Sequence, residues 1–227
     1  MVQDKIAQIK ERISAACSRS GRNPAEVTIL AVTKNRTVEQ INEILNTGLS
    51  AIGENKVQEA LLKLSAISFQ RSSVSLQMIG HLQTNKAKDA VKIFDLIHSV
   101  DSLRLVREID KQAWEINKIQ AILIEVNVSG EVTKYGINPE ELQGLVDSIC
   151  GLRNVRLAGL MTIAPVVDDP EDVRPYFKKL RELRDKIYQS SITNHQLPIL
   201  SMGMTDDFEV AVEEGATIVR IGRGIFE

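Results

Sequence analysis

Residues 27–34 read VTILAVTK, and this run predicts the first strand of the protein. Seven residues that are apolar or β-branched, followed by a charge, are typical of a strand buried on both sides. Lys34 closes the run, so its amine is expected where the strand ends. In parallel α/β folds, ligands bind at the carboxyl ends of the strands.

Lys34 has two interpretations that the strand alone does not separate. A lysine at a strand end can cover apolar surface with its stem while its charged head reaches water. An amine held at a ligand-binding mouth, partly removed from water, is instead a nucleophile toward carbonyl groups. The other strand ends have to decide between the two.

The composition is that of an ordinary soluble globular protein, with 227 residues, 43% hydrophobic and 26% charged, and a net charge of −2. A charge so near zero argues against nucleic acid or an anionic membrane as the partner. Cys17 and Cys150 lack metal or redox spacing, which predicts no metal site and two buried, reduced thiols in a cytoplasmic protein. No apolar run reaches the roughly 18 residues of a membrane helix, and the N-terminus resembles an amphipathic helix rather than a signal peptide.

Apolar strands alternate with amphipathic helices along the whole chain, which indicates a parallel sheet covered by helices. Eight such units predict a single domain over residues 1–227, an α/β fold of the (β/α)8 TIM-barrel type, which typically needs about 250 residues. The expected strands cover residues 27–33, 50–53, 76–80, 94–98, 119–126, 155–160, 199–200 and 216–221.

The two ends of the chain are expected to complete the barrel together. Apolar residues recur every three or four positions over residues 2–17 and predict an extra N-terminal helix. The chain ends at Glu227, too soon for a full eighth helix, whether it is naturally short or truncated. We therefore expect the N-terminal helix to occupy the place of the eighth.

A doubly wound open sheet is the alternative fold. Such a sheet usually has a glycine-rich phosphate-binding turn after its first strand. The corresponding turn here, residues 33–36, reads TKNR and contains no glycine. The barrel is therefore favoured.

Two neighbouring strand ends carry residues suited to a phosphate group. Ser201 and Gly203 stand between the seventh strand and a helix that begins near Thr205, and a hydroxyl, a glycine and free helix amides together suit phosphate. Gly222 follows the eighth strand. Loops after strands seven and eight are the usual phosphate site of these barrels. Turn glycines combined with a helix cap are the alternative interpretation.

Arg220 lies inside the eighth strand, between two apolar neighbours. If its side chain points into the barrel mouth, the guanidinium needs an acceptor, because a buried unpaired charge is costly. A ring nitrogen of a ligand, a phosphate oxygen or a carboxylate such as Glu54 would serve equally.

A lysine, a phosphate site and an arginine at one mouth indicate a phosphorylated carbonyl ligand. Pyridoxal 5′-phosphate (PLP) fits, because its aldehyde joins a lysine as a Schiff base while the protein supplies orientation and electrostatics. A Schiff-base aldolase acting on a sugar phosphate would use the same three parts, although the lysine of an aldolase usually comes from a later strand.

Seven short motifs follow one another over nearly the whole chain. They are LAVTK (30–34), GENKVQE (53–59), IGHLQTNK (79–86), HSVDS (98–102), GLMT (159–162), LSMGMTDD (200–207) and RIGR (220–223). In this order they closely resemble the pyridoxal phosphate homeostasis protein family, whose barrel is similar to the N-terminal domain of alanine racemase. Any one motif would be weak, and their common order makes the resemblance specific.

The resemblance implies PLP as the cofactor and gives roles to five of the residues introduced above. Lys34 is expected to hold PLP as a Schiff base. Arg220 is expected to face the pyridine nitrogen and keep it unprotonated, which weakens the ring as an electron sink. Ser201, Gly203 and Gly222 look like phosphate contacts.

Three further residues lie in the family motifs and are expected to line the cofactor pocket, namely Asn55, His81 and Met161. Each has a structural alternative. Asn55 can cap the helix that follows it, His81 can be a satisfied loop histidine, and Met161 can simply fill space.

Catalysis is not expected from the tyrosines of this chain. Racemisation needs an acid–base group on each face of the cofactor. Alanine racemase takes its second base, a tyrosine, from a further β-domain for which this chain has no length left. Tyr135 is the tyrosine expected nearest the mouth, and a loop-packing role is favoured for it.

We therefore expect a monomeric PLP-binding protein with little or no turnover that contributes to PLP and to amino-acid and keto-acid homeostasis. Transient contact with PLP-dependent enzymes is a further expectation. A PLP-dependent amino-acid racemase is the alternative function, and a Schiff-base aldolase the less favoured one.

Overall fold

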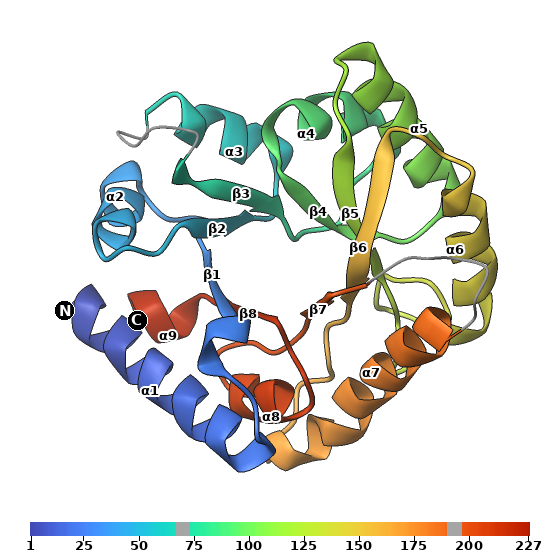
Figure 1. Ribbon diagram of the computed structural model, residues 1–227. Helices are drawn as coiled ribbons and strands as arrows, with labels where there is room; N and C mark the ends of the chain where they lie inside the picture. The colour runs from blue at the N-terminus through green and yellow to red at the C-terminus, as the bar shows by residue number, and fades with distance from the viewer. Residues whose placement is uncertain (67–72, 190–196) are drawn as a thin grey trace.

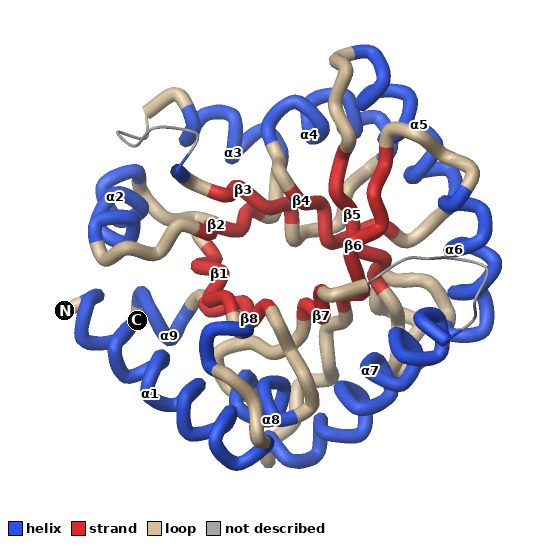
Figure 2. The backbone as a smooth tube through the Cα atoms, viewed as in Figure 1, coloured by secondary structure: helices blue, strands red, loops and turns tan. Residues whose placement is uncertain are grey.

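In the computed structural model, which describes residues 1–66, 73–189 and 197–227, eight parallel strands close into a barrel in their sequence order (Figure 1). Helices surround the strands on all sides (Figure 2), so the expected (β/α)8 TIM-type barrel is confirmed. The strands are β1 (Thr28–Val32), β2 (Ala51–Glu54), β3 (Ser75–Met78), β4 (Leu96–Val100), β5 (Gln120–Glu125), β6 (Val155–Met161), β7 (Ile199–Ser201) and β8 (Ile218–Ile221).

Two of the helices between the strands begin at side-chain caps. The Thr37 hydroxyl accepts from the Gln40 N–H, and the Gln40 side chain accepts from the Thr37 N–H, so a capping box starts the helix after β1. The Ser102 hydroxyl accepts from the Leu105 N–H and caps the helix after β4. The α-helices are α1 (Val2–Ser20), α2 (Val38–Asn46), α3 (Val57–Leu64), α4 (Ala87–Ile93), α5 (Leu103–Glu115), α6 (Leu142–Cys150), α7 (Arg174–Gln189), α8 (Phe208–Glu213) and α9 (Arg223–Phe226).

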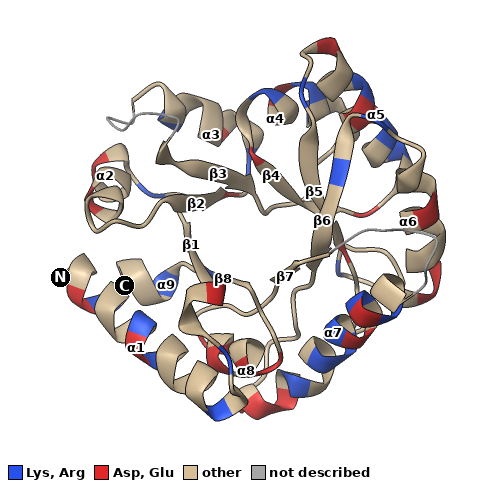
Figure 3. Ribbon diagram, in the orientation of Figure 1, with Lys and Arg blue, Asp and Glu red and all other residues tan. Residues whose placement is uncertain are grey.

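Helix α1 lies on the outside of the barrel beside α8 and α9, as expected for a helix in the place of the eighth (Figure 1). Its apolar face is buried at Ile6, Ile9, Ile13, Ala16 and Cys17. Charged residues of both signs gather on the outer helices, α1 and α7 among them (Figure 3). In the described part of the chain, no helix is both long and apolar enough to cross a membrane.

The fourth strand begins later than the sequence pattern predicts. It spans Leu96–Val100, whereas residues 94–98 were expected. Phe94 ends helix α4 instead, with its N–H on Ala90 O and its ring fully buried. A short apolar run does not by itself separate a buried helix end from a strand start.

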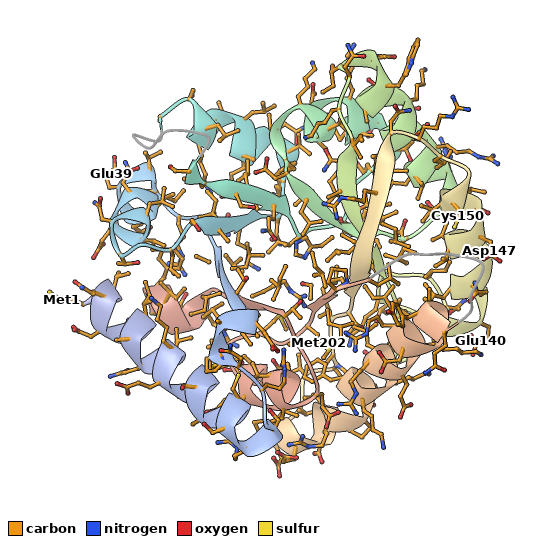
Figure 4. The ribbon with its side chains drawn as sticks, in the orientation of Figure 1. Met1, Glu39, Glu140, Asp147, Cys150 and Met202 are labelled. Carbon is orange, nitrogen blue, oxygen red and sulfur yellow. The ribbon has the colours of Figure 1, made fainter. Side chains whose placement is uncertain are left out.

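The two cysteines are free, and their burial differs from the expectation. Cys17 is buried against the barrel, but Cys150 is exposed. Cys150 is the last residue of α6 and lies at the periphery of the molecule, whereas Met202 lies close to the strands (Figure 4). A cysteine at a helix end escapes burial when the apolar face of the helix points elsewhere.

The strands carry two cores. Their outward side chains pack against the helices in one large cluster. Their inward side chains form a smaller apolar cluster inside the barrel. The inner cluster contains Leu30, Ala51, Leu96, Ala121, Leu123, Ala158, Met161 and Ile218. Polar side chains share this interior at several strand ends, and they lead to the site described next.

Candidate functional site

A cavity of about 520 Å³ opens at the carboxyl ends of the strands. Its walls come from the loops after β1, β2, β6, β7 and β8. The polar lining includes Lys34, Asn55, Thr205, Arg220 and Arg223, and the loop after β6 adds an apolar wall. That wall contains Ile163, Pro165, Val166 and Val167. A concave site with an apolar wall and a few convergent polar groups suits a small ligand.

Lys34 occupies a tight turn directly after β1. The N–H of Arg36 donates to Thr33 O at 3.1 Å and closes this turn. Asn35, the next residue, has a φ of 57°, which is uncommon outside glycine. The Lys34 side chain is exposed and lines the cavity, so its amine is open to water rather than partly dry as the strand pattern suggested.

Arg220 is 5% exposed and bonds entirely to groups of the barrel interior. Its Nη1 donates to Ser201 O at 2.8 Å and to Ser201 Oγ at 2.7 Å, and its Nη2 donates to Thr162 O at 2.8 Å. Glu54, one of the acceptors considered from the sequence, accepts hydrogen bonds from the Lys63 ammonium and the Thr33 hydroxyl instead. The guanidinium is therefore held rigidly at the floor of the cavity.

A directed row of hydrogen bonds continues from Arg220 into the barrel. Ser201 Oγ lies 3.0 Å from His98 Nδ1, His98 Nε2 lies 2.7 Å from Gln77 Oε1, and Gln77 Nε2 donates to Ser75 Oγ at 3.0 Å. Because a guanidinium can only donate, the Ser201 hydroxyl accepts from Arg220 and donates its own hydrogen bond to His98 Nδ1. His98 is then neutral with its proton on Nε2, and burial together with the nearby Arg220 holds its pKa well below the usual value.

Two carboxylates act on the same guanidinium from a distance. Burial lowers the pKa of Arg220 to about 10, and the charges of Glu125 and Asp207 oppose that shift. Burial raises the pKa of Glu125 to about 7, with Arg220 opposing the shift and Asp101 adding to it. Arg220 stays charged at neutral pH, whereas Glu125 is poised to gain or lose a proton there.

Four of the eight residues proposed from the sequence line the cavity, namely Lys34, Asn55, Arg220 and Gly222. Asn55 does not cap the following helix, because the N-cap position of α3 is Lys56, which makes no side-chain capping bond. Gly222 has no packing reason to be glycine, since an added Cβ would meet Val32 at an ordinary 3.5 Å. Packing would therefore tolerate a side chain at this position. A glycine that faces a cavity under these conditions is expected where a ligand approaches the backbone closely.

The other four predicted residues do not line the cavity. The His81 ring stacks on Tyr135 with centroids 4.0 Å apart. Met161 is fully buried in the inner core, and Ser201 Oγ is bonded inside the barrel as described. Gly203 has a φ of 90°, and an added Cβ would lie 2.5 Å from the Ala211 Cβ, so packing alone requires glycine there. Contact of these four with a cofactor stays a prediction.

Comparison with known proteins decides the family. Residues 5–227 match the family model described as alanine racemase, N-terminal domain. A pyridoxal phosphate homeostasis protein of Aquifex aeolicus (strain VF5) is 48% identical over 223 residues, which cover 98% of this chain and 96% of that protein. The chain belongs to the pyridoxal phosphate homeostasis protein family. The family resemblance seen in the seven motifs is thereby confirmed.

Other members and relatives of the family agree. The pyridoxal phosphate homeostasis protein of Pseudomonas aeruginosa is 36% identical over 225 residues, which cover 99% of this chain and 94% of that protein. The structure of PipY from Synechococcus elongatus PCC7942 with PLP bound has a TM-score of 0.87 at 30% identity and covers 100% of both chains. Alanine racemase of Clostridium difficile 630 shares the fold, with a TM-score of 0.73 at 15% identity over 95% of this chain and 57% of that one.

Three polar residues at or near the cavity were not predicted from the sequence as site residues. Thr205 lines the cavity, and its hydroxyl accepts Gly224 N–H at 3.2 Å. His98 and Glu125 lie beneath the cavity as buried polar groups. A signal was present for each, because Thr205 belongs to the same motif as Ser201, and a histidine or glutamate inside an apolar strand is unusual without a partner.

Proposed function

We propose that this protein binds PLP in the cavity at the strand ends and contributes to PLP homeostasis, with little or no turnover of its own. The observation that carries the proposal is the convergence of Lys34, Arg220 and Gly222 on one cavity. The relative PipY, similar over its full length, has PLP bound. The donor set fits the cofactor, with an amine for its aldehyde, a guanidinium for its ring and a glycine turn for its phosphate.

Each residue has a defined task in this proposal. Lys34 would hold PLP through its amine as a Schiff base, and bound PLP would supply an electrophilic carbonyl and an electron-withdrawing ring. Arg220 can only donate hydrogen bonds, so it would keep the ring nitrogen of the cofactor unprotonated. The Gly222 backbone N–H and the Thr205 hydroxyl would bind the phosphate group.

The lining of the cavity supports the proposal of low turnover. No tyrosine, histidine or cysteine is among the described residues that line it, so these residues do not supply a second base of that kind. Tyr135, the tyrosine expected nearest the mouth, stacks on His81 outside the lining. We further propose a cytoplasmic monomer that contacts PLP-dependent enzymes transiently, which the two free cysteines and the near-neutral charge support.

Absorption spectroscopy tests the proposal. Purified protein mixed with PLP is expected to show a Schiff-base band at about 420 nm, a generic property of lysine-bound PLP. Lys34→Ala is expected to lose the band, and Lys88→Ala, a change at an exposed lysine on α4, is expected to keep it. Borohydride reduction should fix PLP on Lys34 as a secondary amine and add the mass of PLP less one oxygen atom.

Three outcomes would contradict this reading. Protein that stays colourless with added PLP would refute cofactor binding. Racemisation of an amino acid by the purified protein would support the racemase alternative and overturn the low-turnover part. Trapping of a sugar phosphate by borohydride, without the PLP band, would support the aldolase.

A further inference from the structure

A nearly buried ammonium group lies beside the turn that carries Lys34. Lys63, on helix α3, is 11% exposed at its side chain. Its Nζ donates three hydrogen bonds, to Thr33 O at 2.6 Å, to Glu54 Oε1 at 2.8 Å and to Glu59 Oε1 at 2.7 Å. An ammonium has three protons, so every donor of Lys63 is used.

These bonds converge on the backbone immediately before and after Lys34. Thr33 O accepts from Lys63, and Thr33 Oγ1 donates to Glu54 Oε1 at 2.6 Å. Asn35 N–H donates to Glu59 Oε1 at 2.7 Å. One ammonium and two carboxylates, from the end of β2 and from α3, therefore tie both neighbours of Lys34.

The turn needs such support. Asn35 adopts a left-handed φ of 57°, which asparagine tolerates better than most residues but which still carries a cost that hydrogen bonds from the surroundings offset. Lys34 itself is exposed at the cavity, so its own side chain does little to order the turn. Part of the ordering comes from the barrel itself, because Thr33 N–H donates to Gly53 O at 2.9 Å. The bonds around Lys63 add ties at Thr33 O and at the Asn35 N–H.

Charge makes the three side chains interdependent. Burial raises the pKa of Glu54, and the hydrogen bonds from Lys63 and Thr33 oppose that shift. For Glu59, burial acts against ionisation, but the bonds from Lys63 and from the Asn35 N–H together lower its pKa. Without the ammonium, two carboxylates would meet beside the turn with no cation between them.

We propose that Lys63, Glu54 and Glu59 form a positioning clamp that holds the Thr33–Arg36 turn and thereby aims the Lys34 amine into the cavity. The inference rests on the proposed function, because Lys34 has to react with a carbonyl for its aim to matter. Lys63 acts through the turn and does not line the cavity.

Two variants separate the clamp from general stability. Lys63→Met removes the ammonium and keeps the length of the side chain. Glu59→Ala removes the acceptor of Asn35 N–H and leaves the Lys63–Glu54 pair in place, so it tests the clamp even if Lys63→Met fails to fold. Glu59→Gln keeps a side-chain oxygen for Asn35 N–H and serves as the rescue, and Lys88→Met is the control at an exposed lysine.

The first measurement is the rate at which the band at about 420 nm grows with PLP, at a temperature where all variants are folded. We expect Lys63→Met and Glu59→Ala to slow it about tenfold, because a misaligned amine loses its attack geometry. Glu59→Gln and Lys88→Met should stay within about twofold of wild type. A purely structural clamp would lower the melting temperature and leave this rate unchanged.

The second measurement needs no cofactor. The amide hydrogen exchange of Asn35, followed by NMR in the absence of PLP, should accelerate in Lys63→Met and Glu59→Ala and stay slow in Glu59→Gln. Wild-type rates of band growth in both clamp variants would overturn the proposal. A wild-type protein that forms no band would refute the proposed function instead, and the exchange of Asn35 would still test the clamp.

Discussion

Two glycines near the strand ends differ in why they are glycine. Gly203 is required by the fold, because its φ of 90° and the Ala211 Cβ at 2.5 Å leave no place for a side chain. Gly222 has a φ of −111°, which any residue adopts, and faces the cavity. The first glycine serves packing of α8 on β7, and the second leaves room for a ligand.

Alanine at each position should separate these roles. Gly203→Ala is expected to lower the free energy of unfolding by about 3 kcal/mol, through strain and overpacking. Gly222→Ala should change it by less than about 1 kcal/mol and should raise the Kd for PLP about tenfold, a loss of about 1.4 kcal/mol. Urea unfolding and PLP titration measure the two effects. Equal losses of stability in both variants would contradict the distinction.

The choice between Ser201 and Thr205 shows what residue patterns could not supply. Both hydroxyls lie in the motif LSMGMTDD after the seventh strand, and either could face a ligand. The structure turns Ser201 Oγ inward to Arg220 and His98 and brings Thr205 to the cavity. Which hydroxyl faces the ligand depends on the register of β7 and on the left-handed glycine between them, and both are tertiary features.

At the scale of elements, α1 closes the outer layer that the short α9 leaves open. Its Ile13 is 3% exposed in the interface with the barrel. On the rim of the contact with α8, Arg12 pairs with Glu209 at 3.2 Å and lies over the Phe208 ring. Apolar burial should therefore dominate the binding of this helix, since exposed ion pairs contribute little.

Substitutions at two neighbouring residues of α1 test whether apolar burial stabilises its packing more than the ion pair does. Ile13→Ala is expected to cost about 2–4 kcal/mol, from lost burial and the cavity left behind. Arg12→Ala should cost about 1 kcal/mol or less, because the Arg12 side chain and its ion pair with Glu209 are largely exposed to solvent. Each variant is the control for the other in urea unfolding. A larger loss in Arg12→Ala would show that charge rather than apolar packing holds α1.

The elements themselves were largely predictable, and their edges less so. Short runs rich in apolar residues identified all eight strands, because most strand residues are buried in the barrel or against the helices. The start of the fourth strand was misplaced at Phe94, whose burial comes from the helix end that precedes it. The apolar character of a residue predicts that it is buried, but it does not predict whether it belongs to a helix or to a strand.

At the scale of the whole molecule, two buried titratable residues in the barrel, Glu125 and His98, make the stability of the fold depend on pH. Burial raises the pKa of Glu125 to about 7 from its ordinary 4.5, so the folded protein keeps a proton that the unfolded chain releases between these values. The contribution of this bound proton to the free energy of unfolding is fully present below pH 4.5 and is lost as the pH rises through about 7. His98 acts in the opposite sense below its usual pKa, because the folded state keeps it neutral while the unfolded chain takes up a proton.

Glu125→Gln isolates the first effect, since glutamine does not titrate. The free energy of unfolding of the variant, relative to wild type, should rise by about 3 kcal/mol between pH 4 and 8, because a shift of one pKa unit corresponds to about 1.4 kcal/mol. Urea unfolding at several pH values measures the difference, in which His98 cancels. Parallel pH profiles for the two proteins would show that Glu125 titrates normally.

The sequence by itself determined the barrel, the family and the position of Lys34, because apolar periodicity and ordered motifs are local properties of the chain. Only the tertiary structure decided which polar residues meet. It joined Arg220 to Ser201 and His98, tied Lys63 to the turn of Lys34, and turned His81 and Met161 away from the cavity lining. Strand register and side-chain direction govern such meetings, and both are set by the closed barrel rather than by neighbours in the sequence.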